Sequence, residues 1–438
     1  MHPTEGPAVA GRPLRCGVAA QPTTRNCMSI EAIRTQIAEI QAKHRQRPEM
    51  IRGQNVPYAR RGEMSIPAFK MKAGGEVETD GRAQSLKLMG KAAQFPIDFF
   101  FYDLEDASPD NPDFKVWARK FVVEALTTND YGKRVVAFRP NNIRTPYFEE
   151  DIVEVLTGAG HRLNAMVIPK TEHAEEVQDV MNIVRDVQRL NGNDNDIRLE
   201  VLIESPRAFI EAEKIAAIDG VAALIFGAWD FARTIGGKVT SEGWIYDQGT
   251  ARQLLPIIAG AYGKEAVDAV TGTLPIRPKK PEGVSDEAYR QALGMRATEV
   301  DVEVFGEDFV VALGKKERAL ELARRDAENA RAAGYAAKWI LHPDQIDPIH
   351  AAWTPSREDA MRALTLAVDY ARAATTGSGA EVDDDRLADK AVVGTDWWIV
   401  EAGFIAGVLT DDDVRATGMT LRELKRTVVT HDAHSALS

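Results

Sequence analysis

The chain has 438 residues, enough for one large domain with appended segments or for two domains. Its composition, 44% hydrophobic and 27% charged, is typical of a globular protein, and a net charge of −12 argues against a nucleic-acid-binding surface. Its two cysteines, Cys16 and Cys27, both lie near the N-terminus, which excludes a disulfide framework and a thiol-based site in the folded part.

Residues 1–27 lack the apolar segment of a secretory signal and are expected to form a disordered tail. No apolar run approaches the ~20 residues that span a bilayer, so we expect a cytoplasmic protein. Residues 28–63 contain an amphipathic helix over 29–47, with Ser29 as its N-cap, and then an irregular basic segment.

From residue 64 to residue 350, apolar segments alternate with stretches of helical periodicity. Eight candidate strands begin near residues 64, 97, 134, 164, 199, 222, 265 and 338. Alternating strands and helices predict a parallel sheet, and eight such units predict an α/β fold of the (β/α)₈ TIM barrel type. The alternative is a doubly wound open sheet, which the absence of a GxGxxG motif after the first strand disfavours.

The alternation breaks in three places. Residues 231–249 are expected to form a glycine-rich loop, and the proline-rich segment 274–312 is expected to be an insertion, with a helix resuming at residue 315. Residues 355–438 contain helical segments around an acidic, irregular stretch at 378–396. This C-terminal part is too small for an independent enzyme, and we expect a helical lid or oligomerisation segment.

Two carboxylates follow neighbouring predicted strands. Glu204 comes directly after LEVLI, and Asp230 follows ALIFGAW one helix later. Because successive parallel strands end at the same edge of a sheet, we expect both side chains to face one small volume. Two carboxylates repel each other unless a cation or a proton lies between them, so this pair predicts a divalent metal site. Helix capping at strand–helix turns is the alternative interpretation.

Other polar residues also follow strands: Glu105, Asp106, Arg139, Lys170 and His342. Acids together with an arginine suit a metal-assisted reaction on an anionic substrate, in which the arginine holds a developing oxyanion. Each residue also has a structural interpretation. The acids can cap a helix, the arginine can form a salt bridge, the lysine can be solvated and the histidine can hydrogen-bond to the backbone.

Six sequence blocks extend the argument: FYDLEDA, VAFRPN, GHRLNAMVIPK, VLIESPRAF, LIFGAWDFA and KWILHPDQI, in that order. They resemble the CitE-like branch of the HpcH/HpaI aldolase and citrate lyase superfamily, with malyl-CoA and β-methylmalyl-CoA lyases as the most similar group. The resemblance covers roughly residues 64–400 apart from the insertion. It implies a Mg²⁺-dependent barrel, with Mn²⁺ as a substitute, in a homotrimer or hexamer with a C-terminal lid.

The resemblance also implies roles for individual residues. Glu204 and Asp230 match metal ligands, and Arg139 matches the arginine that contacts the carbonyl and enolate oxygen. Glu105 and Asp106 match acids that hold metal-bound waters. The family supplies a further aspartate from a neighbouring subunit in a DGRxID-like pattern. Here the corresponding run is DDRLAD, which ends at Asp389 and has lost the glycine and the isoleucine.

The first strand departs from the family pattern. The family has a Val-Pro-Gly turn near the phosphates of coenzyme A, and this chain has Ile66-Pro67-Ala68. We therefore take other basic side chains as candidates for coenzyme A binding, namely Lys70, Lys72, Arg82 and His342. The alternative is that the substrate is not a coenzyme A ester.

The expected function is that of a Mg²⁺-dependent carbon–carbon lyase. It would cleave a 3-hydroxyacyl-CoA of the malyl-CoA type reversibly to an acyl-CoA and a 2-oxo acid such as glyoxylate. The alternatives are a malate synthase that also hydrolyses the thioester, a CoA-independent metal-dependent aldolase, and a non-catalytic binding subunit. The expected partners are small-molecule substrates and further copies of the chain, without nucleic acid or membrane.

Overall fold

The structure, a computed structural model, describes residues 30–45, 52–53, 55–239, 248–376, 380–383 and 386–429. The chain forms two compact units, Met1–Glu49 and Met50–Ser438. In the first unit the predicted helix is present as α1 (Ile30–Arg45). The predicted tail at 1–27 lies outside the described residues.

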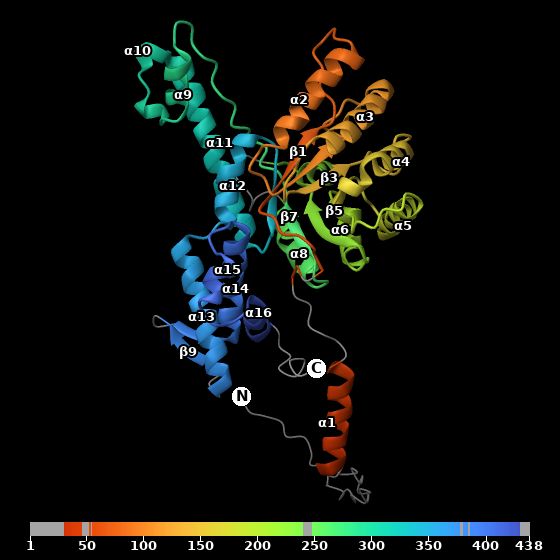
Figure 1. The fold of residues 1–438 in the computed structure, drawn as a ribbon, viewed down its shortest axis with the longest axis vertical. Helices are drawn as coiled ribbons and strands as arrows, with labels where there is room; N and C mark the ends of the chain where they lie inside the picture. Colours follow the sequence, from red (N-terminus) through yellow and green to blue (C-terminus); the bar gives the residue numbers. More distant parts are fainter. Residues whose placement is uncertain are drawn as a thin grey trace, which may run out of the picture. The chain divides into compact units, whose positions relative to one another are not determined.

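Parallel strands of the second unit close into a barrel (Figure 1). They are β1 (Gly62–Pro67), β2 (Phe99–Asp103), β3 (Val135–Arg139), β4 (Ala165–Ile168), β5 (Arg198–Ile203), β6 (Val221–Phe226), β7 (Glu265–Asp268) and β8 (Ala337–Ile340). Each strand pairs with its neighbour in sequence, and β8 pairs with β1 to close the ring. The predicted TIM barrel is confirmed, and every predicted strand is found.

Helices follow the strands and surround the barrel (Figure 1). They are α2 (Arg82–Ala92), α3 (Pro112–Thr128), α4 (Phe148–Ala159), α5 (Ala174–Leu190), α6 (Pro206–Ala216), α7 (Ala228–Ile235), α8 (Gly249–Gly260), α11 (Glu307–Ala332) and α12 (Ile346–Trp353). Single turns lie at η1 (Val77–Gly81), η2 (Gly160–Arg162), η3 (Ala297–Glu299) and η4 (Pro343–Gln345). Local signals start two of the helices: Asn111 and Ser205 accept hydrogen bonds from the first turns of α3 and α6, and a proline follows each cap.

Alternate residues of each strand point into the barrel. The middle of the interior is apolar and holds Phe101, Ala137, Val167, Leu202, Ile225 and Val267. Polar side chains gather only at the two ends, because solvent or an ion partner is available there and not in the middle. The end at the carboxyl termini of the strands holds the candidate site described below.

A buried ion cluster fills the other end of the barrel. The Arg60 guanidinium forms ion pairs with Glu63, with Glu200 at 2.9 Å and with Glu265 at 2.9 Å. Burial, and then the charge of Glu200, raises the pKa of Glu63 well above its usual range. The basic segment predicted at 48–63 therefore has a structural role, because its arginine compensates the carboxylates of three strands.

Residues 231–249 were predicted to be a loop, and this prediction is wrong for the first part. Helix α7 continues through Ile235, with Asp230 in its first turn. Packing overrides the local glycine signal, since Phe231 lies 5.4 Å from Phe226 and 6.1 Å from Phe209 between ring centroids. Residues 240–247 lie outside the described part of the chain.

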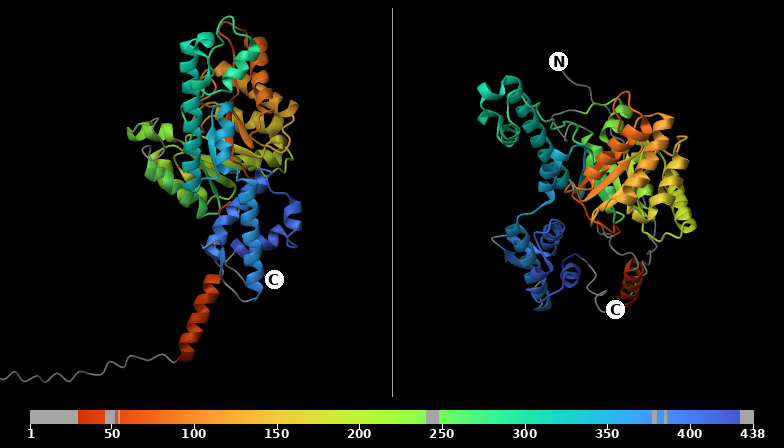
Figure 2. Two further views of the ribbon diagram at one scale, coloured as in Figure 1. Left: turned by 90° about the vertical axis from the view of Figure 1, so that its left-hand side faces the viewer. Right: turned by 45° about the horizontal axis from the view of Figure 1, so that its top comes forward.

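The predicted insertion has its own helices (Figures 1 and 2) and a small apolar core. It contains α9 (Asp286–Leu293), η3 and α10 (Val302–Phe305), and these pack on the first half of α11. Residues Ala292, Val300, Phe309 and Leu313 are buried there. Helix α11 starts at Glu307 instead of the predicted residue 315, because its first turns bury their apolar side chains in this local core.

The C-terminal part is helical, as predicted. It contains α13 (Arg357–Thr376), α14 (Lys390–Ile405), α15 (Asp411–Arg415) and α16 (Leu421–Val429), with buried Trp397 in a separate core. The stretch predicted to be irregular at 378–396 forms the antiparallel strands β9 (Ala380–Asp383) and β10 (Arg386–Asp389) and the start of α14. In the part of the chain that the structure describes, no helix is long and apolar enough to cross a membrane.

A buried histidine on α12 makes the free energy of unfolding depend on pH in a predictable way. His350 on α12 is 7% exposed, and burial lowers its pKa to about 4, although Asp98 acts in the opposite direction. The unfolded chain takes up a proton at this residue near pH 6.5 and the folded chain does not. Stability from this residue is therefore present above pH 6.5 and is lost as the pH falls toward 4.

The free energy of unfolding should fall between pH 7 and pH 5. We predict that this fall is about 2 kcal/mol smaller in His350→Gln than in the wild type. Urea denaturation at the two pH values measures this difference, so any loss of packing in the variant cancels. The matched control is His161→Gln, which changes an exposed histidine and should keep the wild-type difference. An unchanged difference in the His350 variant would contradict the prediction.

Candidate active site

A cavity of about 290 Å³ opens at the carboxyl ends of the strands. Its walls include Asp103, Asp106, Arg139, Glu204, Asp230 and Trp339. Four of the predicted site residues, Asp106, Arg139, Glu204 and Asp230, therefore meet at one place. The sequence-based expectation that these strand ends face a common volume is confirmed for them.

Arg139, the last residue of β3, is held by Asp103, the last residue of β2. Its Nε lies 2.8 Å from one carboxylate oxygen of Asp103, and its Nη2 lies 2.6 Å from the other. Asp103 is fully buried and also accepts the backbone N–H of Glu105 at 2.9 Å. This two-point contact fixes the plane of the guanidinium and leaves Nη1 for other partners.

The third guanidinium nitrogen faces the carboxylate of Glu105. Nη1 of Arg139 lies 3.3 Å from Glu105 Oε2, and the guanidinium carbon lies 5.3 Å from the centre of the Trp339 ring. Burial raises the pKa of Glu105 to about 7, although Arg139 and Lys170 oppose this shift. A carboxyl group with such a pKa can hold or release a proton near neutral pH.

The ammonium group of Lys170 lies among four carboxylates. Its Nζ lies 3.0 Å from Asp106, 3.0 Å from Asp230, 3.6 Å from Glu105 and 3.8 Å from Glu204. Burial alone would lower the pKa of Lys170, but Glu204 and the other carboxylates raise it. The possibility that this lysine is merely solvated is therefore excluded, since its charge compensates the cluster.

The backbone of Lys170 is held in a conformation that costs energy. Its φ of 53° lies in the left-handed region, which side chains other than glycine rarely adopt. The N–H donates to Glu204 Oε1 at 2.5 Å, and the carbonyl accepts from Asn142 Nδ2 at 3.2 Å. Arg144 donates to the same carbonyl. These contacts offset the strain and fix the Lys170 backbone beside Glu204.

Glu204 and Asp230 differ in environment. Burial raises the pKa of Glu204, with Lys170 opposing the shift. Burial would raise the pKa of Asp230, but hydrogen bonds from Lys170 and Arg233 lower it. Gly227 makes room for this arrangement, because a Cβ at that position would lie 2.3 Å from the Cβ of Glu204. A side chain at residue 227 would therefore displace Glu204.

By their chemistry these carboxylates suit a hard divalent cation, although among the described residues no three ligating side chains converge on one metal position. All four groups around the Lys170 ammonium are carboxylates, and Mg²⁺ prefers oxygen ligands, of which the protein usually supplies one or two. The ammonium is attached to a flexible chain whose side chain is 25% exposed, so it can move aside toward Asp106. A metal ion held by Glu204 and Asp230 would then take over its charge.

Four other predicted residues, Lys70, Lys72, Arg82 and His342, are not among the residues that line this cavity. Lys70 and Lys72 follow β1 and are exposed, and Arg82 pairs with Glu124. His342 follows β8 and caps η4, since its Nδ1 accepts the N–H of Asp344 at 3.2 Å. Asp389 is the last residue of β10. The proposed roles of these residues in binding coenzyme A and moving protons stay predictions.

The sequence analysis missed the structural importance of Asp103. A signal was present, because Phe99, Phe101 and Asp103 alternate along β2 and therefore face the same side as Arg139 does on β3. The position of the Lys170 ammonium had no such signal. It depends on a left-handed backbone and on four carboxylates that follow three different strands, and residue spacing predicts neither the backbone conformation nor the contacts.

Comparison with known proteins agrees with the family resemblance seen in the sequence. A profile of the HpcH/HpaI aldolase/citrate lyase family matches residues 82–292. L-malyl-CoA/β-methylmalyl-CoA lyase of Rhodobacter capsulatus is 30% identical over 69% of this chain and 86% of its own. The (3S)-malyl-CoA thioesterase of Cereibacter sphaeroides is 23% identical over 69% of this chain and 85% of its own.

Among solved structures, a similar fold is that of protein CitE from Mycobacterium tuberculosis in complex with magnesium, acetoacetate and coenzyme A. It is 22% identical, covers 80% of this chain and 98% of its own, and has a TM-score of 0.50.

The lysine among the carboxylates leads to a stability prediction. Without divalent metal, Lys170→Met should lower the free energy of unfolding by about 1–2 kcal/mol, because four carboxylates lose a partly buried counter-charge. Adding Mg²⁺ should restore most of this loss. Urea denaturation with EDTA and with MgCl₂ measures both effects. Lys91→Met, an exposed lysine on α2, is the control; a Lys170 variant as stable as wild type in EDTA would refute the prediction.

Proposed function

Because this chain belongs to the HpcH/HpaI aldolase/citrate lyase family, we propose that it is a Mg²⁺-dependent carbon–carbon lyase acting on a coenzyme A ester. The substrate would be a 3-hydroxyacyl-CoA of the malyl-CoA type, cleaved reversibly to an acyl-CoA and a 2-oxo acid such as glyoxylate. One observation carries the proposal: a positioned arginine and an all-oxygen carboxylate cluster share one cavity at the strand ends. This arrangement suits stabilisation of an enolate beside a cation.

Each side chain has a distinct task in this proposal. Glu204 and Asp230 would hold Mg²⁺, which when bound supplies a Lewis acid for the oxygens of the 2-oxo acid. Arg139 would donate from its Nη1 to the enolate oxygen of the acyl-CoA, in the orientation that Asp103 imposes. Glu105 and Asp106 would orient water at the site. Asp389 of a neighbouring subunit would move the proton at the α-carbon in the condensation direction.

Thioester hydrolysis is the second candidate function. A related chain is a (3S)-malyl-CoA thioesterase, and Glu105, with its pKa raised to about 7, has a suitable proton affinity to activate water. Product analysis separates the two functions, because a lyase releases an acyl-CoA whereas hydrolysis releases free coenzyme A. A CoA-independent aldolase would turn over the 2-oxo acid without any coenzyme A ester.

The proposal includes an assembly and a compartment. A catalytic Asp389 from a second copy requires an oligomer, for which the family resemblance implies a homotrimer or a hexamer. We expect this assembly in the cytoplasm.

The metal ligands provide a direct test. Glu204→Gln and Asp230→Asn should each lower kcat/KM for malyl-CoA cleavage by about a hundredfold or more, because an amide is a poorer ligand for Mg²⁺ than a carboxylate. EDTA should abolish wild-type activity, and Mg²⁺ should restore it. Mass spectrometry of all coenzyme A species measures turnover. Glu175→Gln on α5 is an exposed control that should keep full activity; full activity in either folded ligand variant would reject the proposal.

The contact between Asp103 and Arg139 predicts a different effect. Asp103→Asn removes one charged acceptor from the guanidinium and should lower kcat about tenfold to a hundredfold. Mg²⁺ affinity, measured by calorimetry, should stay the same, because Asp103 does not face Lys170. Ser65→Ala removes only a 3.3 Å contact to Asp103 and should lower kcat less than about threefold. Equal effects of the two variants would argue against a positioning role for Asp103.

A further inference from the structure

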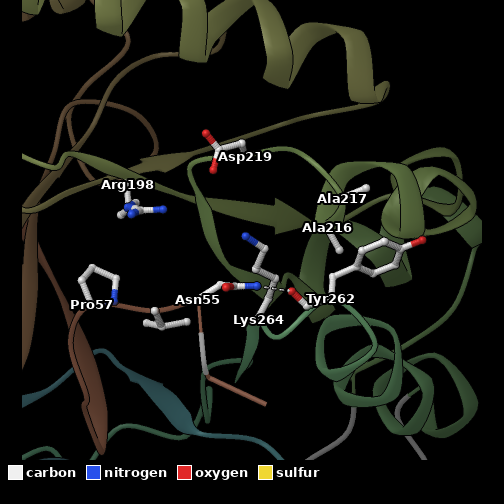
Figure 3. Close-up of a pocket in the computed structure, with 9 residues that line it drawn as sticks. Asn55, Pro57, Arg198, Ala216, Ala217, Asp219, Tyr262 and Lys264 are labelled. Atoms are coloured by element: carbon white, nitrogen blue, oxygen red, sulfur yellow. Dashed lines mark hydrogen bonds between the residues drawn. The ribbon is translucent and has the colours of Figure 1, made fainter. Parts of the chain in front are cut away.

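A second cavity, of about 470 Å³, lies at the opposite end of the barrel from the candidate active site (Figure 3). Its walls come from residues that precede or begin three neighbouring strands: Arg198 for β5, Asp219 for β6 and Lys264 for β7. The segment that contains Asn55 and Pro57 forms another side of the cavity, and Asn55 Nδ2 donates to the carbonyl of Tyr262 at 2.9 Å. The lyase chemistry proposed above uses none of these residues.

The lysine of this cavity is nearly buried and forms no ion pair with the residues that the structure describes. Lys264 is 5% exposed, and within the described residues its ammonium group has no hydrogen bond or ion pair. Figure 3 shows its nitrogen pointing into the space between Arg198 and Asp219. Burial, together with the charge of Arg198, lowers the pKa of Lys264, although Asp219 opposes this shift. Two cationic side chains at one cavity repel each other, and an anion between them would remove that cost.

The neighbouring charged side chains form no ion pair with the Lys264 ammonium among the described residues. Asp219 is already paired, since Arg185 Nη2 lies 2.9 Å from its carboxylate. Arg198 contacts Asp196 at 2.6 Å through Nη2, while its buried Nε has no partner among the described residues. Two cationic side chains, Arg198 and Lys264, therefore line one cavity, and Lys264 forms no ion pair with the described residues.

A basic cavity elsewhere at the same end of the barrel provides a contrast. It is lined by Lys133, Arg134, His161 and Arg162. There Arg134 donates to the carbonyls of Phe95 and Tyr131, and Arg162 donates to two further carbonyls. Those guanidinium groups stabilise loop ends. The Lys264 ammonium has no such task among the described residues.

We propose that the cavity around Lys264 binds a phosphorylated small molecule. The ammonium of Lys264 and the guanidinium of Arg198 would bind the phosphate as charge-assisted donors. The cavity is larger than a phosphate group, and Tyr262 lines it together with Val56, Pro57, Ala216 and Ala217. These walls suit a small apolar or aromatic group attached to the phosphate.

Two probes test this site on the full chain. Calorimetric titration with inorganic phosphate and with phenyl phosphate, in EDTA and at constant ionic strength, should detect one site, with tighter binding of phenyl phosphate. Lys264→Met and Arg198→Met should weaken binding of phenyl phosphate by at least about tenfold. Lys214→Met, an exposed lysine on the adjacent helix α6, and Arg139→Lys in the active-site cavity should bind it like wild type.

Thermal melting separates loss of binding from loss of fold. Lys264→Met should melt at or above the wild-type temperature in phosphate-free buffer, because methionine removes a buried unpaired charge. The proposal is overturned by absence of binding, by wild-type affinity in the Lys264 variant, or by loss of binding in the Arg139 variant alone. Equal affinity for inorganic phosphate and phenyl phosphate would overturn the proposal that the apolar walls bind the group attached to the phosphate.

Discussion

The site depends on the register between β2 and β3, which places Asp103 directly opposite Arg139. Both residues end their strands, and both point into the barrel because side chains alternate along a strand. A shift of one residue would turn one partner outward and leave the other as an unpaired buried charge. The apolar layer beneath them, with Phe101 and Ala137, fixes this register and so determines the plane of the guanidinium.

Charge compensation organises both ends of the barrel in similar ways. At the end away from the site, the fully buried side chain of Arg60 offsets carboxylates from three strands. At the site, Lys170 does the same for four carboxylates, but its side chain remains partly exposed. This difference in exposure matters because a buried arginine cannot leave its partners without a large cost in free energy, whereas a partly exposed lysine can.

The sequence was sufficient to predict the barrel, its eight strands and the convergence of Arg139, Glu204 and Asp230. These features follow from apolar periodicity and from the rule that parallel strands end at one edge. It was not sufficient for α7, where aromatic packing of Phe231 overrides the glycine signal, or for the hairpin of β9 and β10 within an acidic stretch. Lys170 was predicted to lie at a strand end, but the position of its ammonium among the carboxylates was not, because it depends on contacts between segments that are distant in sequence.

The lysine at the centre of the carboxylates also bears on how the protein matures. A cluster of carboxylates without a counter-charge would allow the chain to fold only after a metal ion binds. Small zinc-dependent domains fold only with their metal bound. With the Lys170 ammonium in place, the newly made chain can complete its barrel without metal. If Glu204 and Asp230 hold Mg²⁺ as proposed, loading would be an exchange of one cation for another on a finished scaffold.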